Sequence, residues 1–256
     1  SVIHQQWQLD CLLEANLVSP IDCWLKIDTG MHRLGVPVEL AESSHQRLQA
    51  CKSVARIRLM SHFANADEPD HPLNPIQLSA FNQARGMFAL NESSMANSAA
   101  LVAMPDSHMQ WVRPGIMLYG SSPAKDKTAD ELDLKSVMQF ESRLLAVKSL
   151  KQGDSIGYGS TWQCPEDMKV GIVAAGYADG YPRHAESGTP VWINNVLCPL
   201  LGRVSMDSIC IDLRDVEAEA NERVVLWGNE LSVDVVAEHA STIAYELLCH
   251  TGAALG

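Results

Sequence analysis

Along the first half of the chain, short apolar runs with strand periodicity alternate with longer segments of helical periodicity. In chain order the predicted elements are a strand at 2–4, a helix at 5–17, a strand at 23–27, a helix at 38–51, a strand at 56–60, a helix at 74–90, a strand at 94–96, a helix opening at 98–101 and a strand at 116–119. Strand–helix alternation at about thirty residues per unit predicts parallel strands joined by right-handed crossovers. Either an α/β barrel or a doubly wound sheet fits this pattern.

The pattern of hydrophobic and polar positions changes after a polar stretch at 125–135. Beyond it, short apolar runs are separated by Gly, Asn and Pro, which is typical of an antiparallel β-sandwich or barrel. The predicted strands lie at 144–147, 170–173, 191–193, 209–213 and 224–227, with a turn at Asn194–Asn195 and helices at 233–239 and from 244 onward. We therefore expect two domains, at 1–125 and 126–256.

Composition narrows the class of protein. A net charge of −12 over 256 residues argues against nucleic acid and anionic membranes as partners, because both attract basic surfaces. No apolar run reaches the ~18 residues that a membrane span needs. The seven cysteines are scattered and form no CxxC pair, which favours small buried thiols in a reduced, cytoplasmic protein over disulfides or a metal site.

Polar side chains that could carry chemistry follow successive predicted strands. Arg33, His62, Asn97–Ser98 and Arg113–Ile116 each come just after, or close to, a strand end. In a βα barrel such positions meet at one edge, and a loop leading into a helix suits an anion such as phosphate. Singly, these residues also fit a salt-bridge arginine, a structural histidine and a helix N-cap. Their convergence favours a functional site.

Eight segments occur in the order and at about the spacing found in alanine racemases, which use pyridoxal phosphate (PLP). They are Asp28–Gly35 (DTGMHRLG), Ser61–Glu68, Asn97–Ala99, Val112–Gly120, Gly157–Trp162 (GYGSTW), Gly176–Arg183 (GYADGYPR), Gly202–Asp207 (GRVSMD) and Ala244–Leu247. The chain thus resembles that family along nearly its whole length. The resemblance implies a partial TIM barrel made of C-terminal βα units, followed by a mostly β C-terminal domain.

The resemblance implies how the cofactor ring is held. Arg113 would face the pyridine nitrogen and leave it unprotonated, because arginine stays charged. His62 would orient Arg113 through a hydrogen bond. Arg33 would contact the phenolic oxygen of the cofactor and lie near the substrate carboxylate. Lys26 matches a position that is carbamylated in some relatives.

The resemblance also implies a phosphate site. Ser98, preceded by Asn97, would bind the phosphate together with the backbone amides of Gly115 and Ile116. Tyr245 would add a phenolic hydrogen bond. No metal is implied.

Tyr158 would act as one of the two bases that interconvert L- and D-alanine, since racemisation removes a proton on one face and supplies it on the other. Met206 and Asp207 would shape the substrate pocket, and 176–183 would line its entrance. In the family this tyrosine reaches the partner subunit, so a homodimer with composite active sites is implied.

One family feature is missing from the sequence. None of the eight lysines stands in a segment like that of the family's Schiff-base lysine. The βα units also count to about half a barrel, whose open sheet edge is unfavourable. We therefore expect a racemase that lacks its N-terminal part and is inactive alone. The alternative is a non-catalytic remnant that at most binds PLP or a partner chain; a PLP-dependent decarboxylase relative is a weaker possibility.

Overall fold

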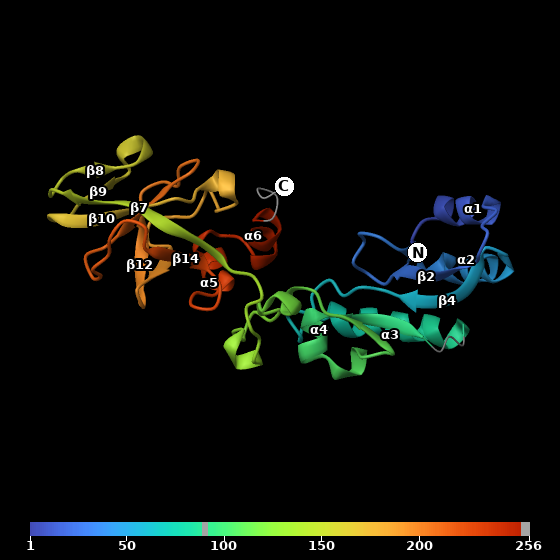
Figure 1. Ribbon diagram of the computed structural model, residues 1–256. Helices are drawn as coiled ribbons and strands as arrows, with labels where there is room; N and C mark the ends of the chain where they lie inside the picture. Colours follow the sequence, from blue (N-terminus) through green and yellow to red (C-terminus); the bar gives the residue numbers. More distant parts are fainter. Residues whose placement is uncertain (89–91, 252–256) are drawn as a thin grey trace. The chain divides into compact units, whose positions relative to one another are not determined.

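The structure is a computed structural model that describes residues 1–88 and 92–251. The chain divides into two compact units, one comprising residues 1–117 with 123–127 and the other residues 118–122 with 128 onward. Each unit contains its own sheet (Figure 1). The chain passes between the units more than once, and the predicted boundary between residues 125 and 126 lies in this crossover region.

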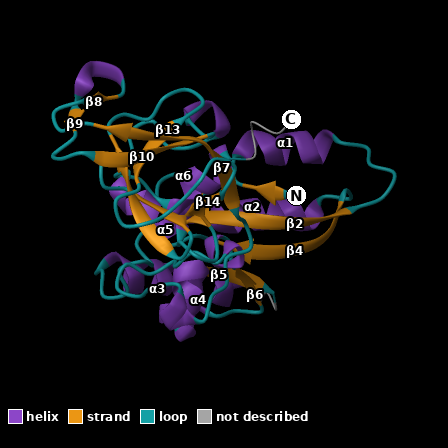
Figure 2. Ribbon diagram, turned by 60° about the vertical axis from the view of Figure 1, so that its left-hand side comes forward, coloured by secondary structure: helices purple, strands orange, loops and turns teal. Residues whose placement is uncertain are grey.

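Within the described residues of the first unit, parallel strands form an open sheet in the order β1-β2-β4-β5-β6, and β3 pairs with the end of β2 (Figure 2). The strands are β1 Val2–Ile3, β2 Ile21–Asp28, β3 Val36–Pro37, β4 Val54–Met60, β5 Ser93–Asn97 and β6 Trp111–Arg113. The helices are α1 Gln6–Glu14, α2 Val38–Ala50, α3 Leu73–Phe88 and α4 Ser98–Ala103. The predicted strand–helix alternation is confirmed, except that the end of the 74–90 helix lies outside the described residues.

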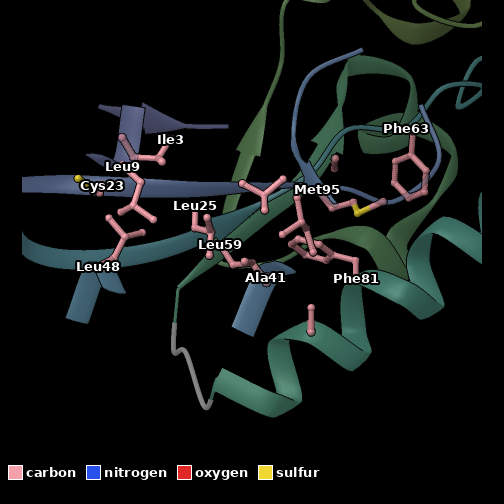
Figure 3. Packing of buried hydrophobic residues seen from close by; sticks show 14 of the residues in the cluster. Ile3, Leu9, Cys23, Leu25, Ala41, Leu48, Leu59, Phe63, Phe81 and Met95 are labelled. Carbon is pink, nitrogen blue, oxygen red and sulfur yellow. The ribbon is translucent and has the colours of Figure 1, made fainter. Parts of the chain in front are cut away.

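One face of this sheet packs on the helices. Along β2, Cys23, Leu25 and Ile27 are fully buried, because alternate side chains of a strand point to the same face. Figure 3 shows Cys23 beside Leu9 of α1, and Leu25 beside Leu59 of β4. Met95 of β5 belongs to the same cluster. Helix residues complete the cluster: Leu9 of α1, Ala41 and Leu48 of α2, and Phe81 of α3.

The opposite face carries a buried cation between two aromatic rings. The Arg58 guanidinium lies 5.5 Å from the ring centre of Trp24 and 5.6 Å from that of Trp111. Its Nη1 donates to Asp22 at 2.8 Å and its Nε to Glu92 at 2.5 Å. The ion pairs and the ring contacts together offset the desolvation of the charge.

The predicted strand at 116–119 is wrong, because Ile116–Tyr119 forms a 3-10 turn and the last strand of the sheet is β6. Pro114 follows β6 directly and has no N–H to continue the ladder. After the turn, Gly120 has φ +84°, and a Cβ there would lie 2.0 Å from the Lys135 carbonyl oxygen. Four apolar residues in a row do not distinguish a strand from a helical turn.

Within the described residues of the second unit, antiparallel strands close a barrel in the order β10-β13-β12-β11-β14-β7. The barrel strands are β7 Phe140–Leu150, β10 Met168–Val173, β11 Pro190–Ile193, β12 Val196–Leu201, β13 Ile209–Asp212 and β14 Arg223–Trp227. A hairpin of β8 Ser155–Ile156 and β9 Trp162–Gln163 stands apart, and the helices α5 Val233–His239 and α6 Ala244–His250 follow the barrel. Of the two predicted alternatives for the second unit, the structure shows a barrel and not a sandwich.

Strand β12 has no counterpart among the predicted strands, because Pro199 interrupts its apolar run and proline weakens a strand prediction. It pairs with β11 across the predicted turn, where Asn194 and Asn195 have φ +48° and +64°. Asparagine tolerates this left-handed region, which two-residue hairpin turns require.

All seven cysteines are free thiols, and Cys23, Cys51, Cys164 and Cys198 are buried. The prediction of small buried thiols is wrong for Cys11 and Cys249, which are exposed on α1 and α6. In the two described stretches of chain, no helix is long and apolar enough to cross a membrane.

Candidate active site

The predicted residues of the first unit follow the carboxyl ends of four neighbouring parallel strands. Arg33 follows β2, His62 follows β4, Ser98 follows β5, and Arg113 is the last residue of β6. Because the strands are parallel, these ends share one edge of the sheet, the edge where βα-barrel enzymes carry their active sites.

Arg113 is held by groups of strand β5 and of the loop that follows β4, including the Met95 carbonyl at 3.4 Å. Its Nη1 donates to the Ser94 hydroxyl, and its Nη2 donates to the Ser61 carbonyl at 2.6 Å. The same Nη2 lies 3.2 Å from His62 Nδ1. Burial lowers the pKa of Arg113. No carboxylate of residues 1–88 or 92–251 forms an ion pair with it.

His62 is neutral at pH 7. Burial lowers its pKa to about 4, and the positive charges of Arg113, Arg33 and Lys26 act in the same direction. Since Arg113 can only donate, His62 Nδ1 is the acceptor of their hydrogen bond and the ring proton is on Nε2. The expected hydrogen bond between His62 and Arg113 is therefore present in this geometry.

Lys26 adds a further positive charge at this edge. Burial lowers its pKa, the charges of Arg33 and Arg113 lower it further, and Asp28 partly opposes them. Asp28 mainly shapes the loop that carries Arg33, because its carboxylate accepts the amides of Gly30 and His32, both at 3.0 Å. Burial alone would raise the pKa of Asp28, but these hydrogen bonds leave it lowered. The exposed Arg33 thus projects from an anchored loop.

Ser98 and Gly115 meet between β5 and β6. The Gly115 amide donates to Ser98 Oγ at 2.6 Å, which leaves the serine hydroxyl proton free to be donated elsewhere. A Cβ at position 115 would contact only that hydroxyl, at 3.9 Å. The Asn97 side chain accepts the Ala100 amide at 3.0 Å and caps α4. Ile116, at the start of the turn, is buried.

Tyr158 belongs to the second unit and lies on a constrained turn at residues 157–160. Gly157, Gly159 and Ser160 all have positive φ, and the Tyr158 side chain is 69% exposed. A Cβ on Gly159 would lie 3.3 Å from Arg203 Nη1, so the turn rests directly on that guanidinium. Glycine is favoured at position 159 because its φ of +76° is one that residues with a Cβ rarely adopt.

Met206 follows three residues after Arg203, the residue that the Tyr158 turn contacts. Met206 and Asp207 are both exposed. The amides of Tyr177 and Ala178 donate to the carbonyls of Ser205 and Met206, at 3.1 and 2.8 Å. Residues 202–207 are therefore packed between the Tyr158 turn and the 176–183 loop, and the second-unit motifs are brought together. Arg183 lies 5.9 Å from the Tyr177 ring centre.

Tyr245 is half-exposed on α6 of the second unit, next to Ala244, which is buried. Its role toward the phosphate stays a prediction. Among the described residues, no three His, Cys, Asp or Glu side chains lie so that they could hold a metal ion.

Sequence reasoning missed a buried polar network behind the strand-end residues. Its centre is Gln77 of α3, which is fully buried. A polar residue in register with Phe81 and Ala84 on the core face of a helix is the signal that could have found it.

Comparisons with known proteins agree with this geometry. The sequence profile of the alanine racemase N-terminal domain matches residues 1–123, and that of the alanine racemase C-terminal domain matches residues 137–255. The chain belongs to the alanine racemase family. The alanine racemase of Nitrosococcus oceani is 52% identical over 250 residues, which are 97% of this chain and 70% of that relative.

Solved alanine racemases share the fold. The biosynthetic enzyme of Pseudomonas aeruginosa superposes with a TM-score of 0.92 at 45% identity, over 98% of this chain and 70% of its own. The Bartonella henselae enzyme, solved with covalently bound pyridoxal phosphate, is 28% identical with a TM-score of 0.79, over 90% of this chain and 64% of its own. The predicted racemase family and the predicted partial TIM barrel followed by a β domain are confirmed.

Proposed function

We propose that this chain provides the PLP site and one of the two bases of an alanine racemase that interconverts L- and D-alanine. The observation that carries the proposal is the Arg113 guanidinium, which His62, Ser61 and Ser94 hold at the active-site edge without a carboxylate partner in the described chain. PLP bound there supplies an electron sink that acidifies the Cα–H of the amino acid.

The donor set fits the cofactor. Arg113, permanently protonated, donates toward the pyridine nitrogen and keeps that nitrogen from gaining a proton. Ser98, with its hydroxyl proton available, binds the phosphate together with the Gly115 and Ile116 amides, and Tyr245 adds its phenol. Asn97 supports this site by capping the helix that begins at Ser98.

Three positive charges, those of Lys26, Arg33 and Arg113, favour the anionic groups of cofactor and substrate. Arg33 contacts the phenolic oxygen of the cofactor and the substrate carboxylate. Met206, through its amide, and Asp207 complete the substrate pocket.

Tyr158 moves the proton on one face of the substrate Cα. Its exposed phenol on a constrained turn suits delivery into a second copy of the chain, so we propose a homodimer with composite sites. The other base is the family's Schiff-base lysine, which matches none of the eight lysines here. By themselves, therefore, these 256 residues bind PLP without a covalent link and do not racemise alanine.

Equilibrium binding of PLP tests the site directly. Arg113→Met should weaken PLP binding at least about tenfold, the effect of one charge-assisted hydrogen bond. The matched control is Arg56→Met, an exposed arginine elsewhere on the same sheet, which should leave binding unchanged. Equal affinities for wild type and Arg113→Met would refute the assignment of Arg113.

Tyr158 is tested by complementation. The chain is co-expressed with the part of the Nitrosococcus oceani relative that lies outside the match, and alanine racemisation is followed. Activity that falls at least about 100-fold on Tyr158→Phe supports its role as a base. Activity that survives the substitution contradicts it.

A further inference from the structure

A single amide side chain joins the two loops that carry Arg33 and His62. Gln77 of α3 is fully buried. Its Nε2 donates to the His62 carbonyl at 3.0 Å and to Thr29 Oγ1 at 3.3 Å, and its Oε1 accepts the Ala64 amide at 3.0 Å. One helix residue thus fixes the loop after β2 and the loop after β4 at once.

The hydrogen bonds beyond Gln77 run in one direction. Ser61 Oγ donates to the Ile27 carbonyl at 2.8 Å, and a carbonyl can only accept. Ser61 Oγ therefore accepts from Thr29 Oγ1, which lies 2.8 Å away, and Thr29 in turn accepts from Gln77. Such a one-way chain is cooperative, so losing its first donor weakens every later bond.

The chain of contacts ends at Arg113. The Ser61 carbonyl accepts Arg113 Nη2 at 2.6 Å, and the next residue, His62, offers its Nδ1 to the same nitrogen. Gln77 binds the backbone directly after the His62 Cα, at the carbonyl of 62 and the amide of 64, which lie on either side of Phe63. It therefore fixes the backbone from which the imidazole extends toward Arg113.

A second buried amide on the same helix provides the contrast. Asn74 is also fully buried, and its Nδ2 binds the carbonyls of Asn65, Glu68 and Pro69 at 3.0, 2.9 and 3.2 Å. It closes the far part of the β4 loop and makes none of the contacts to His62. If Gln77 only stabilised the fold, replacing Gln77 and replacing Asn74 should have similar effects.

We propose that Gln77 is a positioning residue of the active site, which holds His62 in the orientation and tautomer that let it accept from Arg113. The consequence for the cofactor rests on the proposed function, because it requires that Arg113 faces the PLP ring. The state of the imidazole does not depend on the cofactor and can be measured without it.

The first readout is the ¹⁵N spectrum of the histidine rings in the whole chain without cofactor. In the wild type, His62 should be a single tautomer protonated on Nε2. Gln77→Met, nearly equal in size, should give a mixture of tautomers, whereas Asn74→Leu should leave the His62 signals unchanged even where it lowers stability. An unchanged His62 in Gln77→Met, or an equal change in Asn74→Leu, would overturn the proposal.

Thr29→Val covers the case in which Gln77→Met does not fold. It removes the middle of the hydrogen-bond chain and should shift His62 in the same direction by a smaller amount; no shift would overturn the proposal. The second readout is PLP affinity, which should fall about tenfold in Gln77→Met and stay unchanged in Asn74→Leu. A wild type that binds no PLP would refute the proposed function, while the tautomer measurement would still decide the role of Gln77.

Discussion

His62, which lies half-buried beside Arg113, should make the first unit lose stability as the solution becomes acidic. Unfolded histidine titrates near 6.5, and in the folded chain burial and three nearby cations lower the pKa of His62 to about 4. Above pH 6.5 the ring is neutral in both states and contributes no pH dependence. Below it, the unfolded chain takes up a proton that the folded chain refuses, so stability falls until the pH reaches about 4.

The size of the effect follows from the two pKa values. Each tenfold difference in proton affinity is about 1.4 kcal/mol, so the full loss between pH 6.5 and 4 is about 3 kcal/mol. His62→Gln removes the titrating group. Between pH 6.5 and 4, the free energy of unfolding should therefore fall by about 3 kcal/mol less in this variant than in the wild type. His184→Gln is the matched control, because His184 is exposed in the other unit.

Urea unfolding between pH 4 and 7.5 measures this difference. The ¹⁹F resonance of fluorotryptophan at position 24 reports the first unit alone, since Trp24 lies in its sheet. Parallel stability curves for wild type and His62→Gln would refute the argument that His62 is neutral and half-buried among cations.

Three further substitutions test separate parts of the structure. Gly35→Ala should destabilise the first unit by at least about 2 kcal/mol in urea unfolding, because the φ of Gly35 is +146° and a Cβ there would lie 2.5 Å from the Asp28 backbone nitrogen. Gly86→Ala, in open space on α3, should stabilise it by up to about 1 kcal/mol. Equal effects of the two substitutions would contradict this reasoning. Arg58→Met should cost about 2 kcal/mol in the same assay and Arg56→Met less than about 0.5 kcal/mol. The reverse order would contradict the role given to the ion pairs of the buried Arg58 side chain with its more exposed partners Asp22 and Glu92. Ser98→Ala should weaken PLP binding about fivefold in equilibrium dialysis, and unchanged affinity would place the phosphate elsewhere.

Much of the secondary structure could be predicted because periodicity reports burial directly. The alternation of Cys23, Leu25 and Ile27 marks β2, and those residues are fully buried. The pattern failed where local signals compete. The apolar run 116–119 is a 3-10 turn after a proline, and β12 was missed because Pro199 lies inside it.

The strand-end residues could be predicted because topology alone brings parallel strand ends to one edge. The hydrogen bonds that hold these residues in place could not be predicted, because they depend on which side chains of α3 reach which loop. Gln77 and Asn74 lie on the buried face of the same helix, yet only the three-dimensional contacts assign one of them to His62. The turn of Tyr158 likewise rests on Arg203, more than forty residues away in the sequence.

Borohydride reduction of the purified chain with PLP, followed by peptide mapping and an assay of alanine interconversion, tests the central claim most directly. The proposed function predicts that PLP binds through the Arg113 and Ser98 side of the site, that no lysine becomes labelled, and that L- and D-alanine do not interconvert. A labelled lysine together with interconversion would contradict the proposed function. Lys26 is the position to examine first, because its pKa is lowered by the charges of Arg33 and Arg113.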